Sequence, residues 1–449
     1  MNRRGEFSED TRQAVHMAMG GFALALPFLS WWYATTFALL AVFFNLGLLE
    51  RLTWRPLFRP DEHRRVFTSG IVLYPTAVFG LLLAFPSRPD IVAAAWGILA
   101  AGDGMASIVG RRWPIARLPW NGEKSVGGSL AFVLFGGSAG AFLAWWCGTS
   151  LQPPPYGWFM IAGPFIAATA AGAVETLPVT LDDNVSVSAS AGAVMWALSL
   201  VSEDLVAAAL RAPAMAVVVP VVLNVSVAGA GYFARTVTVA GAITGAVIGT
   251  VIMFFTGFAG WTLLLASFAC AVVTSRMGLA RKRAQGIEEA RGGRRGPGNA
   301  IANTGVAAAA AAMSALTYAH DPARLAFVAA LVAGSSDTVA SEIGKAWGRR
   351  TFLVTTARRV PPGTSGAMSL EGTLAGIGSA ALLGAGAAGL GLINWDLVLI
   401  VAAAATAGAL VESALGATFE ERGIVNNDVL NFLNTAAAAY AAIVLWQLR

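Results

Sequence analysis

Long apolar segments recur along the chain and predict its fold class. Stretches of roughly 17–25 apolar residues are each long enough to cross about 30 Å of hydrocarbon as a helix. Representative stretches are Ala14–Ser30, Ile91–Val109, Ile161–Glu175, Thr236–Phe255 and Leu397–Gly416. We count about fifteen such spans, and closely spaced pairs within Met17–Leu49 are the hardest to divide. The pattern predicts an all-α fold, that of a polytopic helical membrane protein.

Composition supports this fold class. Of the 449 residues, 56% are hydrophobic and only 12% are charged, whereas about 25% of a soluble globular chain is charged. The N-terminal sequence MNRRGEFSEDTRQ lacks both the order of a cleaved signal peptide and the acid-poor character of a transit peptide. Cys147 and Cys270 lie far apart in apolar segments, so we expect both to serve packing and neither a disulfide nor a metal site.

Positive charge gathers in three loops, which predicts how the chain lies in the membrane. The cations are Arg111, Arg112, Arg117 and Lys124; Arg276, Arg281, Lys282, Arg283, Arg291, Arg294 and Arg295; and Lys345, Arg349, Arg350, Arg358 and Arg359. Short loops rich in Lys and Arg stay in the cytoplasm, and alternation from a cytoplasmic N-terminus places all three there. We therefore expect a bacterial inner-membrane protein with its C-terminus outside and no nucleic-acid partner.

Four sequence blocks occur twice in the same order, which predicts two related modules, 1–235 and 236–449. The paired blocks are Gly102–Gly110 with Ser336–Gly344, Glu123–Phe132 with Ala367–Gly376, Ala171–Pro178 with Ala407–Gly416, and Leu181–Ser190 with Val425–Asn434. The expected topology places every block at the cytoplasmic end of a span, so the repeats are parallel. An inverted-repeat transporter would instead gather its polar groups near the midplane. The pattern favours two active sites that face the cytoplasm.

The first block carries a carboxylate on a helix face shared with Ser and Gly. Asp103, Ser107 and Gly110 have the spacing i, i+4, i+7, and Asp337, Ser341 and Gly344 repeat it. A carboxylate at the membrane boundary is costly and usually functional, and it suits Mg²⁺, which takes carboxylate and phosphate oxygens. The alternative is that each aspartate caps a helix or pairs with Arg111 or Lys345.

The second block is small and hydroxylated and precedes a span. It contains Lys124, Ser125, Gly128 and Ser129 in one half and Ser369, Gly372 and Thr373 in the other. Free amides at a helix N-terminus bind phosphate, although the serines could equally be ordinary N-caps. The glycine spacing of a P-loop is absent, and GAGAAG (Gly384–Gly389) fits helix packing inside a span.

The third and fourth blocks add further oxygen ligands. Glu175 and Glu412 lie in apolar runs, where they serve either catalysis or a hydrogen bond between helices. The fourth block could complete a cation site or cap a helix with Asp182, Asp183, Asn184, Asn426, Asn427 and Asp428. Carboxylates, donors and cations at a membrane surface suit nucleotide-dependent phosphoryl transfer to a lipid, whose tail would lie in an apolar cleft between helices.

Two motifs of the first half resemble the phytol kinase and dolichol kinase (polyprenol kinase) family. They are GDGMASIVGRRW…LPWNGEKSVGGSLAF and RQAVHMAMGG, in which Arg12, His16 and Gly20 share a helix face. Gln13 and Gly127 depart from the family pattern, which bears on acceptor preference. The resemblance implies a membrane enzyme that uses CTP, commonly, to phosphorylate an isoprenoid alcohol, with Asp103, Lys124, Ser129 and Glu175 in the site.

The second half resembles the phytyl-phosphate kinases, which convert an isoprenyl monophosphate to the diphosphate. The matching motifs are GAITGAVIGTVIMFFTGFAG, GRRGPGNAIANTG, SSDTVASEIG, VPPGTSGAMSLEGTLAG and NNDVLNFLNT. The resemblance implies a fusion of two consecutive kinases. It also implies a second site formed by Arg294, Arg295, Asn299, Asn303, Asp337, Glu342, Thr364, Ser369, Thr373, Glu412 and Asn427.

Together these inferences predict the site residues of a kinase that needs Mg²⁺ and CTP or another nucleoside triphosphate. The catalytic carboxylates are Asp103, Glu175, Asp337 and Glu412, and the same four with Glu342 would bind the metal. The nucleotide and phosphate would be bound by Ser107, Gly110, Arg111, Lys124, Ser125, Gly128, Ser129, Arg294, Arg295, Asn299, Asn303, Ser341, Gly344, Lys345, Thr364, Ser369, Gly372, Thr373 and Asn427. Arg12 and His16 complete the set.

Two other functions remain open at this point. A cytidylyltransferase that forms a CDP-lipid would also combine CTP, Mg²⁺ and a membrane lipid, but its expected signature dense in lysine and aspartate is absent. A lipid or ion transporter would use the intramembrane acids as a relay and need no nucleotide. Transfer of labelled phosphate from a nucleotide to phytol separates the three.

Overall fold

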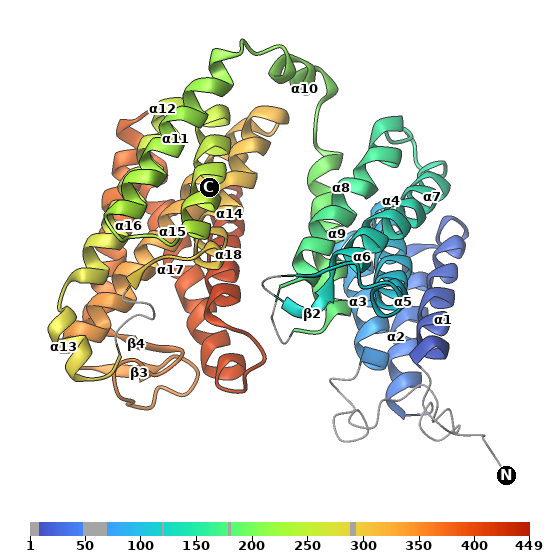
Figure 1. Cartoon of the computed structure of the whole chain (residues 1–449), viewed down its shortest axis with the longest axis horizontal. Coiled ribbons are helices and arrows are strands. Elements are labelled where there is room, and N and C mark those ends of the chain that lie inside the picture. The colour runs from blue at the N-terminus through green and yellow to red at the C-terminus, as the bar shows by residue number, and fades with distance from the viewer. Residues whose placement is uncertain (1–8, 48–69, 119–120, 178–180, 288–292) are drawn as a thin grey trace. The chain divides into compact units, whose positions relative to one another are not determined.

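The computed structural model describes residues 9–47, 70–118, 121–177, 181–287 and 293–449, so Arg291 lies outside the described residues. The described chain is mostly helical, as predicted, and forms two compact units, Met1–Leu200 (unit 1) and Val201–Arg449 (unit 2) (Figure 1). The expected seam near Arg235 falls inside unit 2, because α11 (Met215–Phe233) packs along α12 (Val239–Arg276).

Unit 1 is built from short helices and one hairpin. In chain order its elements are α1 (Glu9–Met19), the 3₁₀ helix η1 (Gly20–Phe28), α2 (Trp31–Gly47), α3 (Gly70–Ala84), α4 (Pro89–Gly97), the π-helix η5 (Ile98–Asp103), α5 (Gly104–Arg112), β1 (Arg117–Leu118), β2 (Asn121–Ser125), α6 (Val126–Ala131), the π-helix η6 (Phe132–Gly136), α7 (Gly137–Gly148), α8 (Gly157–Glu175) and α9 (Asp183–Ser199).

Unit 2 contains longer helices and a second hairpin. Its elements are α10 (Glu203–Leu210), α11, α12, α13 (Leu279–Ala284), α14 (Pro297–Leu316), α15 (His320–Trp347), β3 (Thr351–Leu353), β4 (Ala367–Ser369), α16 (Leu370–Gly389), the 3₁₀ helix η8 (Trp395–Leu397), α17 (Val398–Leu415), the π-helix η9 (Gly416–Glu420) and α18 (Asn427–Gln447).

Each unit has a central helix that is buried on every side. In unit 1, α4 and η5 fill this position, and Ile91, Ile98 and Leu99 have no exposed surface. In unit 2 it is α15, which is buried without interruption from 325 to 336. A helix that is hydrophobic all round must be covered by neighbours. Both central helices run into the first sequence block, which brings Asp103 and Asp337 to the edge of each core.

A short antiparallel hairpin leads into one helix of each unit. β1 pairs with β2, and β3 pairs with β4. The last residue of each second strand caps the next helix, because Ser125 Oγ accepts from the Gly128 amide (3.1 Å) and Ser369 Oγ from the Gly372 amide (3.0 Å). Both serines therefore act as N-caps, which is one of the two roles that the sequence allowed.

Among the described residues, ten helices are long and apolar enough to cross a membrane, and α2 and α3 are shorter apolar helices. This is fewer than the about fifteen spans expected from hydropathy. Hydropathy does not show where a helix breaks. Ala14–Ser30 divides at Gly20 into the end of α1 and a 3₁₀ helix, and α12 holds two helical segments joined at Gly257, whose φ of 67° lies in the left-handed region.

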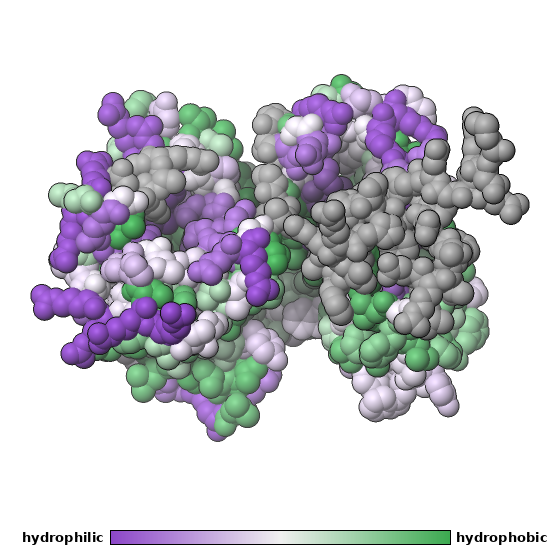
Figure 2. Space-filling view, turned by 90° about the horizontal axis from the view of Figure 1, so that it is seen from below, coloured by the Kyte–Doolittle hydropathy of each residue, from purple (hydrophilic) through white to green (hydrophobic). Residues whose placement is uncertain are grey.

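The surfaces of the units fit this arrangement. Large apolar side chains such as Phe37, Phe233 and Leu399 are exposed on the outer helices, as lipid-facing helices require. Figure 2 shows hydrophilic side chains gathered at the end of unit 2 that carries α13, β3 and β4. This end holds the exposed Arg349, Arg350, Arg358 and Arg359 of the third basic loop.

Candidate active sites at the ends of two buried helices

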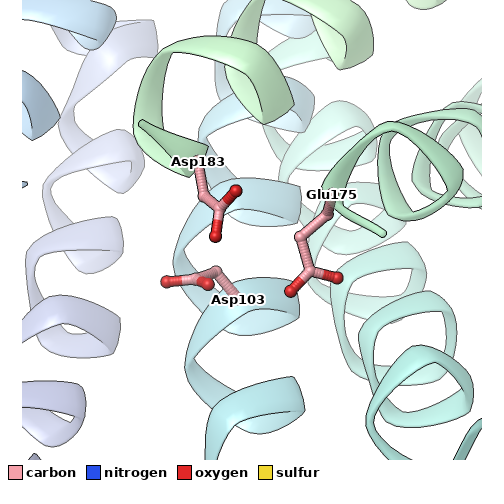
Figure 3. Close-up of side chains that lie close together, drawn as sticks. All are labelled: Asp103, Glu175 and Asp183. Atoms are coloured by element: carbon pink, nitrogen blue, oxygen red, sulfur yellow. The ribbon is translucent and has the colours of Figure 1, made fainter. Parts of the chain in front are cut away.

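Three carboxylates from three helices meet in unit 1. One oxygen each of Asp103, Glu175 and Asp183 lies within 4.8 Å of the others (Figure 3). Asp103 ends the π-helical segment η5, a rare geometry that is frequent at functional sites, and its side chain does not cap α5. Glu175 ends α8 and Asp183 begins α9. Tertiary folding therefore gathers residues that the sequence placed in three separate blocks.

Lys124 on β2 holds two of these carboxylates. Its Nζ donates to Glu175 Oε1 over 2.6 Å and to Asp183 Oδ2 over 3.1 Å. Burial disfavours the charged ammonium, but Glu175 and Asp183 outweigh that effect and raise the pKa of Lys124 above its ordinary value. Lys124 therefore stays charged and partly neutralises the acidic cluster.

The fourth block divides its roles between neighbouring residues. Asp182 caps α9, because its Oδ1 accepts from the Asn184 backbone amide over 2.9 Å and from Asn184 Nδ2 over 2.7 Å. Burial raises the pKa of the Asp182 carboxyl group, while the Asn184 hydrogen bonds oppose the rise. Asp183 instead belongs to the acidic cluster. The residue that caps the helix and the residue that could bind a metal are therefore adjacent in the sequence.

The predicted Arg12 and His16 also lie at this site. His16 Nε2 is 3.6 Å from Asp103 Oδ2 and 3.3 Å from the Leu99 carbonyl oxygen. A Cβ atom placed on Gly70 would lie 2.9 Å from Arg12 Nη2 and 3.7 Å from Asp182 Oδ2. The first helix therefore turns its imidazole and guanidinium groups toward the acidic cluster.

Other predicted residues of unit 1 serve packing or surface contacts in this structure. A Cβ atom on Gly128 would lie 3.1 Å from the Ala106 carbonyl oxygen and 3.4 Å from Gly110 Cα, so α5 and α6 touch through their backbones. Arg111 pairs with Asp10 over 2.8 Å and donates to the Ser107 carbonyl oxygen over 3.1 Å. Ser129 Oγ donates to the Ser125 carbonyl oxygen over 3.2 Å.

Unit 2 brings Asp337 of α15 beside Glu412 of α17. Asp337 lies in the middle of a helix, so it is not a helix cap. Asn434 of α18 lies next to Glu412 and is fully buried. Among the described residues, neither polar side-chain atom of Asn434 nor Glu412 Oε2 makes a hydrogen bond of ordinary geometry. Two acids and the buried polar side chain of Asn434 define a second candidate site.

Two lysines neutralise Glu342, the third predicted acid of unit 2. Its Oε2 accepts from Lys282 Nζ over 2.5 Å and its Oε1 from Lys345 Nζ over 3.0 Å. Lys282 is fully buried on α13, and Glu342 is 3% exposed. Lys345 also lies close enough to Asp337 to interact with it electrostatically. Glu342 thus belongs to an ion-pair network beside the site.

Most of the remaining predicted residues of unit 2 lie in two places, the start of α14 and the surface beside β3 and β4. Arg295 lies just before α14, and Asn299 and Asn303 lie in its first two turns; Arg295 Nη1 donates to Asn299 Oδ1 over 3.0 Å. Ser369 and Thr373 line a depression of about 540 Å³ beside β3 and β4, together with Arg350 and Arg359. The other predicted residues lie apart from these two groups. Arg294 is exposed, Ser341 lies on α15, Thr364 donates to the Pro361 carbonyl oxygen, and Asn427 begins α18.

Gly344 and Gly372 repeat the helix contact of unit 1. A Cβ atom on Gly372 would lie 2.3 Å from the Ala340 carbonyl oxygen and 3.2 Å from Gly344 Cα. In both units the small residues of the second block let their helix touch the central helix at a glycine, and that glycine follows the acidic residue by the same number of positions. Their expected contact with phosphate stays a prediction.

Sequence reasoning missed one important residue and underused another. Lys282 was one cation among many in a basic loop, and no sequence pattern links it to Glu342 across 60 positions. Asp183 was recognised only as a residue that could cap or bind a cation. The doubled aspartate at the start of a helix was the available signal, because a cap needs only one of the two.

The fold and the sites define a polytopic membrane protein with carboxylate clusters at the ends of its buried helices. The model of the integral membrane protein family DUF92 matches residues 222–439, and two relatives that are 39% and 35% identical to the chain match it over 78% and 70% of their own length. The chain belongs to this DUF92 family of integral membrane proteins.

Relatives carry names that bear on function. An uncharacterized membrane protein of Synechocystis, sll0875, is 39% identical over 44% of this chain and 78% of its own length. The chloroplastic protein VTE6 of Arabidopsis thaliana is 35% identical over 50% of this chain and 70% of its own length. A probable phytol kinase of Glycine max, chloroplastic, is 30% identical over 39% of this chain and 59% of its own length. No solved structure matches the chain.

Proposed function

We propose that the chain is a bifunctional isoprenoid kinase. Unit 1 would phosphorylate phytol or a similar alcohol such as geranylgeraniol, and unit 2 would convert the monophosphate to the diphosphate. CTP or another nucleoside triphosphate would be the donor, with Mg²⁺. One observation carries this proposal: each unit places two carboxylates from separate helices side by side where the buried stretch of its central helix ends. The name of the phytol kinase relative supports the class of acceptor.

Local geometry supports the idea that the units are related modules. In each unit a hairpin ends in a serine that caps the next helix, and that helix touches the central helix through a glycine pair. In each unit a helix begins inside the fourth block, one residue beyond a capping side chain, Asp182 or Asn426. These three matches, at the first, second and fourth repeated blocks, are the basis for proposing two parallel repeats.

The acidic groups of each unit fit Mg²⁺. In unit 1, Asp103, Glu175 and Asp183 would hold the ion, since their oxygens lie within 4.8 Å of each other and Mg²⁺ prefers oxygen ligands. In unit 2, Asp337 and Glu412 would hold it, and one or two carboxylates with substrate phosphates suffice for Mg²⁺. The ion would neutralise charge that develops on the transferred phosphoryl group.

The protein's own residues would position the reactants. In unit 1, the alcohol oxygen attacks the γ-phosphorus, the bond to the bridging oxygen breaks and the nucleoside diphosphate leaves. A carboxylate of the cluster orients the hydroxyl group and accepts its proton, while Lys124 stabilises the phosphate charge. In unit 2 the acceptor is a phosphate monoester, which is largely ionised at pH 7 because its second pKa is about 6, so no hydroxyl proton has to be removed.

The nucleotide of unit 2 would lie beside its hairpin. Ser369 and Thr373 line the depression there with Arg350 and Arg359, and guanidinium groups bind phosphate through paired donors. In each unit, we place the end that carries the hairpin in the cytoplasm, where the nucleotide is available, because the basic loops lie at that end.

One assay tests the proposal against its rivals. Purified full-length protein is incubated with Mg²⁺, phytol and CTP labelled at the γ-phosphate, and the lipid products are separated. Labelled phytyl monophosphate and then diphosphate support the kinase. Label that reaches lipid only from α-labelled CTP would indicate a cytidylyltransferase. The absence of labelled lipid with all four common nucleoside triphosphates and with phytol, farnesol and geranylgeraniol would overturn the proposal.

A further inference from the structure

Unit 2 contains a cavity to which the proposed function above gives no role. It has a volume of about 140 Å³ and lies among α11, α12, α14 and α15. Its walls are mostly apolar or small and include Val227, Ile248, Leu264, Phe268 and Leu331. Gly245 lines the cavity and is itself exposed, so the cavity opens at that point of α12.

The cavity wall is polar and cationic where it meets the start of α14. Arg295, Gly296, Asn299 and Asn303 line it there. No side chain caps the N-terminus of α14, and free amides with a positive dipole at a helix N-terminus attract anions. Arg295 is fixed in place by its backbone, because its amide donates to the Thr236 carbonyl oxygen over 2.9 Å and its carbonyl oxygen accepts from Thr238 over 3.0 Å.

This polar end adjoins the candidate active site. Gly334 and Ser335 of α15 both line the cavity, and a Cβ atom on Gly334 would lie 3.0 Å from Asn303 Oδ1. Asp337 follows on the same helix, and three residues rise only about 4.5 Å along a helix axis. The cavity is therefore bounded by the turn before Asp337 on α15 and by the exposed Gly245 on α12.

We propose that this cavity is the acceptor site of unit 2, in which an isoprenyl monophosphate places its phosphate against Arg295 and Asn299 and its first isoprene units between the helices. The inference rests on the proposed function of unit 2. It is supported by the match between an anionic head with an apolar tail and a cavity that is cationic at one end and apolar along its length.

The size of the cavity fits part of such a chain. One water needs about 10–15 Å³ of this kind of volume, so the cavity would hold on the order of ten waters or a similar number of methylene groups. A longer chain has to leave through the opening at Gly245. Chain length should therefore matter at Gly245.

Unit 1 has a corresponding set of residues, and its side chains differ as expected for an alcohol acceptor in place of a phosphate. Arg12, His16 and Gly20 have the same i, i+4, i+8 spacing as Arg295, Asn299 and Asn303. The correspondence extends to packing, because a Cβ atom on Gly20 would lie 2.6 Å from Ala100 Cβ, and Ala100 precedes Asp103 by the same three positions as Gly334 precedes Asp337. Unit 1 thus presents an imidazole where an alcohol would lie. Unit 2 presents a carboxamide, whose N–H groups donate to a phosphate.

The test narrows the opening with Gly245→Leu and uses Gly378→Leu as its matched control. A Cβ atom at either glycine would meet no atom within 4 Å, and Gly378 is exposed on α16 outside the cavity. Full-length variants are assayed with CTP and either a 20-carbon or a five-carbon isoprenyl monophosphate. We expect Gly245→Leu to raise KM for the 20-carbon acceptor about 10-fold or more. Its KM values for the five-carbon acceptor and for CTP should stay unchanged, and Gly378→Leu should behave like the unsubstituted protein.

A binding measurement keeps the test independent of turnover. Radiolabelled 20-carbon monophosphate and the corresponding alcohol are bound to the full chain without nucleotide. Weaker binding of both by Gly245→Leu, and of the monophosphate alone by Arg295→Gln, supports the site. Binding by Gly245→Leu equal to that of Gly378→Leu overturns it. Absence of turnover in the unsubstituted protein with normal binding would refute the kinase proposal and leave the acceptor site standing.

Discussion

Lys124 donates a 2.6 Å hydrogen bond to Glu175 in unit 1, 51 residues further along the chain. The residue that aligns with Lys124 in the second half is Met368 on β4. Unit 2 instead has Lys345 near its acidic pair. The two sites thus use carboxylates from corresponding sequence blocks but receive their positive charge from different elements, so each should respond to its own substitutions.

Asp103→Asn should stop formation of monophosphate from phytol while added phytyl monophosphate is still converted to diphosphate. The amide keeps the shape of the side chain but lacks the charge that would bind Mg²⁺ in the proposed mechanism, and loss of a metal contact lowers the rate on the order of 10²-fold or more. Both products are measured in the same preparation. Asp10→Asn, which changes a surface ion pair with Arg111, is the control, and equal loss of both activities in Asp103→Asn would argue against separate sites.

Asp337→Asn should give the reverse pattern, with monophosphate accumulating from phytol. Asp337 is not at a helix start, so asparagine cannot compensate as it would in a cap. Diphosphate production is measured over a Mg²⁺ titration, and we expect a rate loss of about 10²-fold or more at ordinary Mg²⁺. Near-normal turnover there would show that Asp337 does not bind the metal.

Lys124→Met should lower the stability of the metal-free protein in a way that depends on pH. The raised pKa of folded Lys124 means that its pairing stabilises the protein fully below the unfolded pKa of about 10.4 and is lost as pH rises through the folded value. The difference in unfolding temperature from the unsubstituted protein should stay constant from about pH 6 to 9 and shrink above about pH 10.5. A difference that already falls between pH 7 and 8 would contradict this assignment.

Lys282→Ala should destabilise unit 2, because it leaves Glu342 buried with one cation instead of two. Breaking a buried ion pair typically costs about 3–5 kcal/mol, and the remaining Lys345 should keep the loss near the lower end. Unfolding in detergent is followed for Lys282→Ala, Glu342→Gln and the double variant. We expect the double variant to be more stable than the sum of the single losses predicts, and strict additivity would mean that the pair does not interact.

Single cysteines should report the orientation in the membrane. In a background without Cys147 and Cys270, Arg117→Cys and Arg358→Cys should resist an impermeant reagent added to intact cells and react in inverted vesicles. Tyr318→Cys is the matched control for the opposite face, since Tyr318 is 73% exposed and adjoins a loop with few cations. Labelling of Arg117→Cys or Arg358→Cys from outside intact cells would contradict the predicted orientation.

The sequence by itself determined the class of fold and the candidate residues of the sites. Uninterrupted apolar segments predict helices in lipid because a buried backbone must satisfy its own hydrogen bonds. Acids such as Glu175 stood out because charge is rare in such segments.

Only the tertiary structure decided which of these residues act together. Whether Asp182 or Asp183 reaches Glu175 depends on where α9 begins, and a shift of one residue turns a helical side chain by about 100°. The helix breaks at Gly20 and Gly257 follow from packing and backbone angles, which hydropathy does not record. The Lys282–Glu342 pair joins side chains 60 positions apart. Such contacts depend on how the helices pack in three dimensions, and local sequence patterns carry no information about that arrangement.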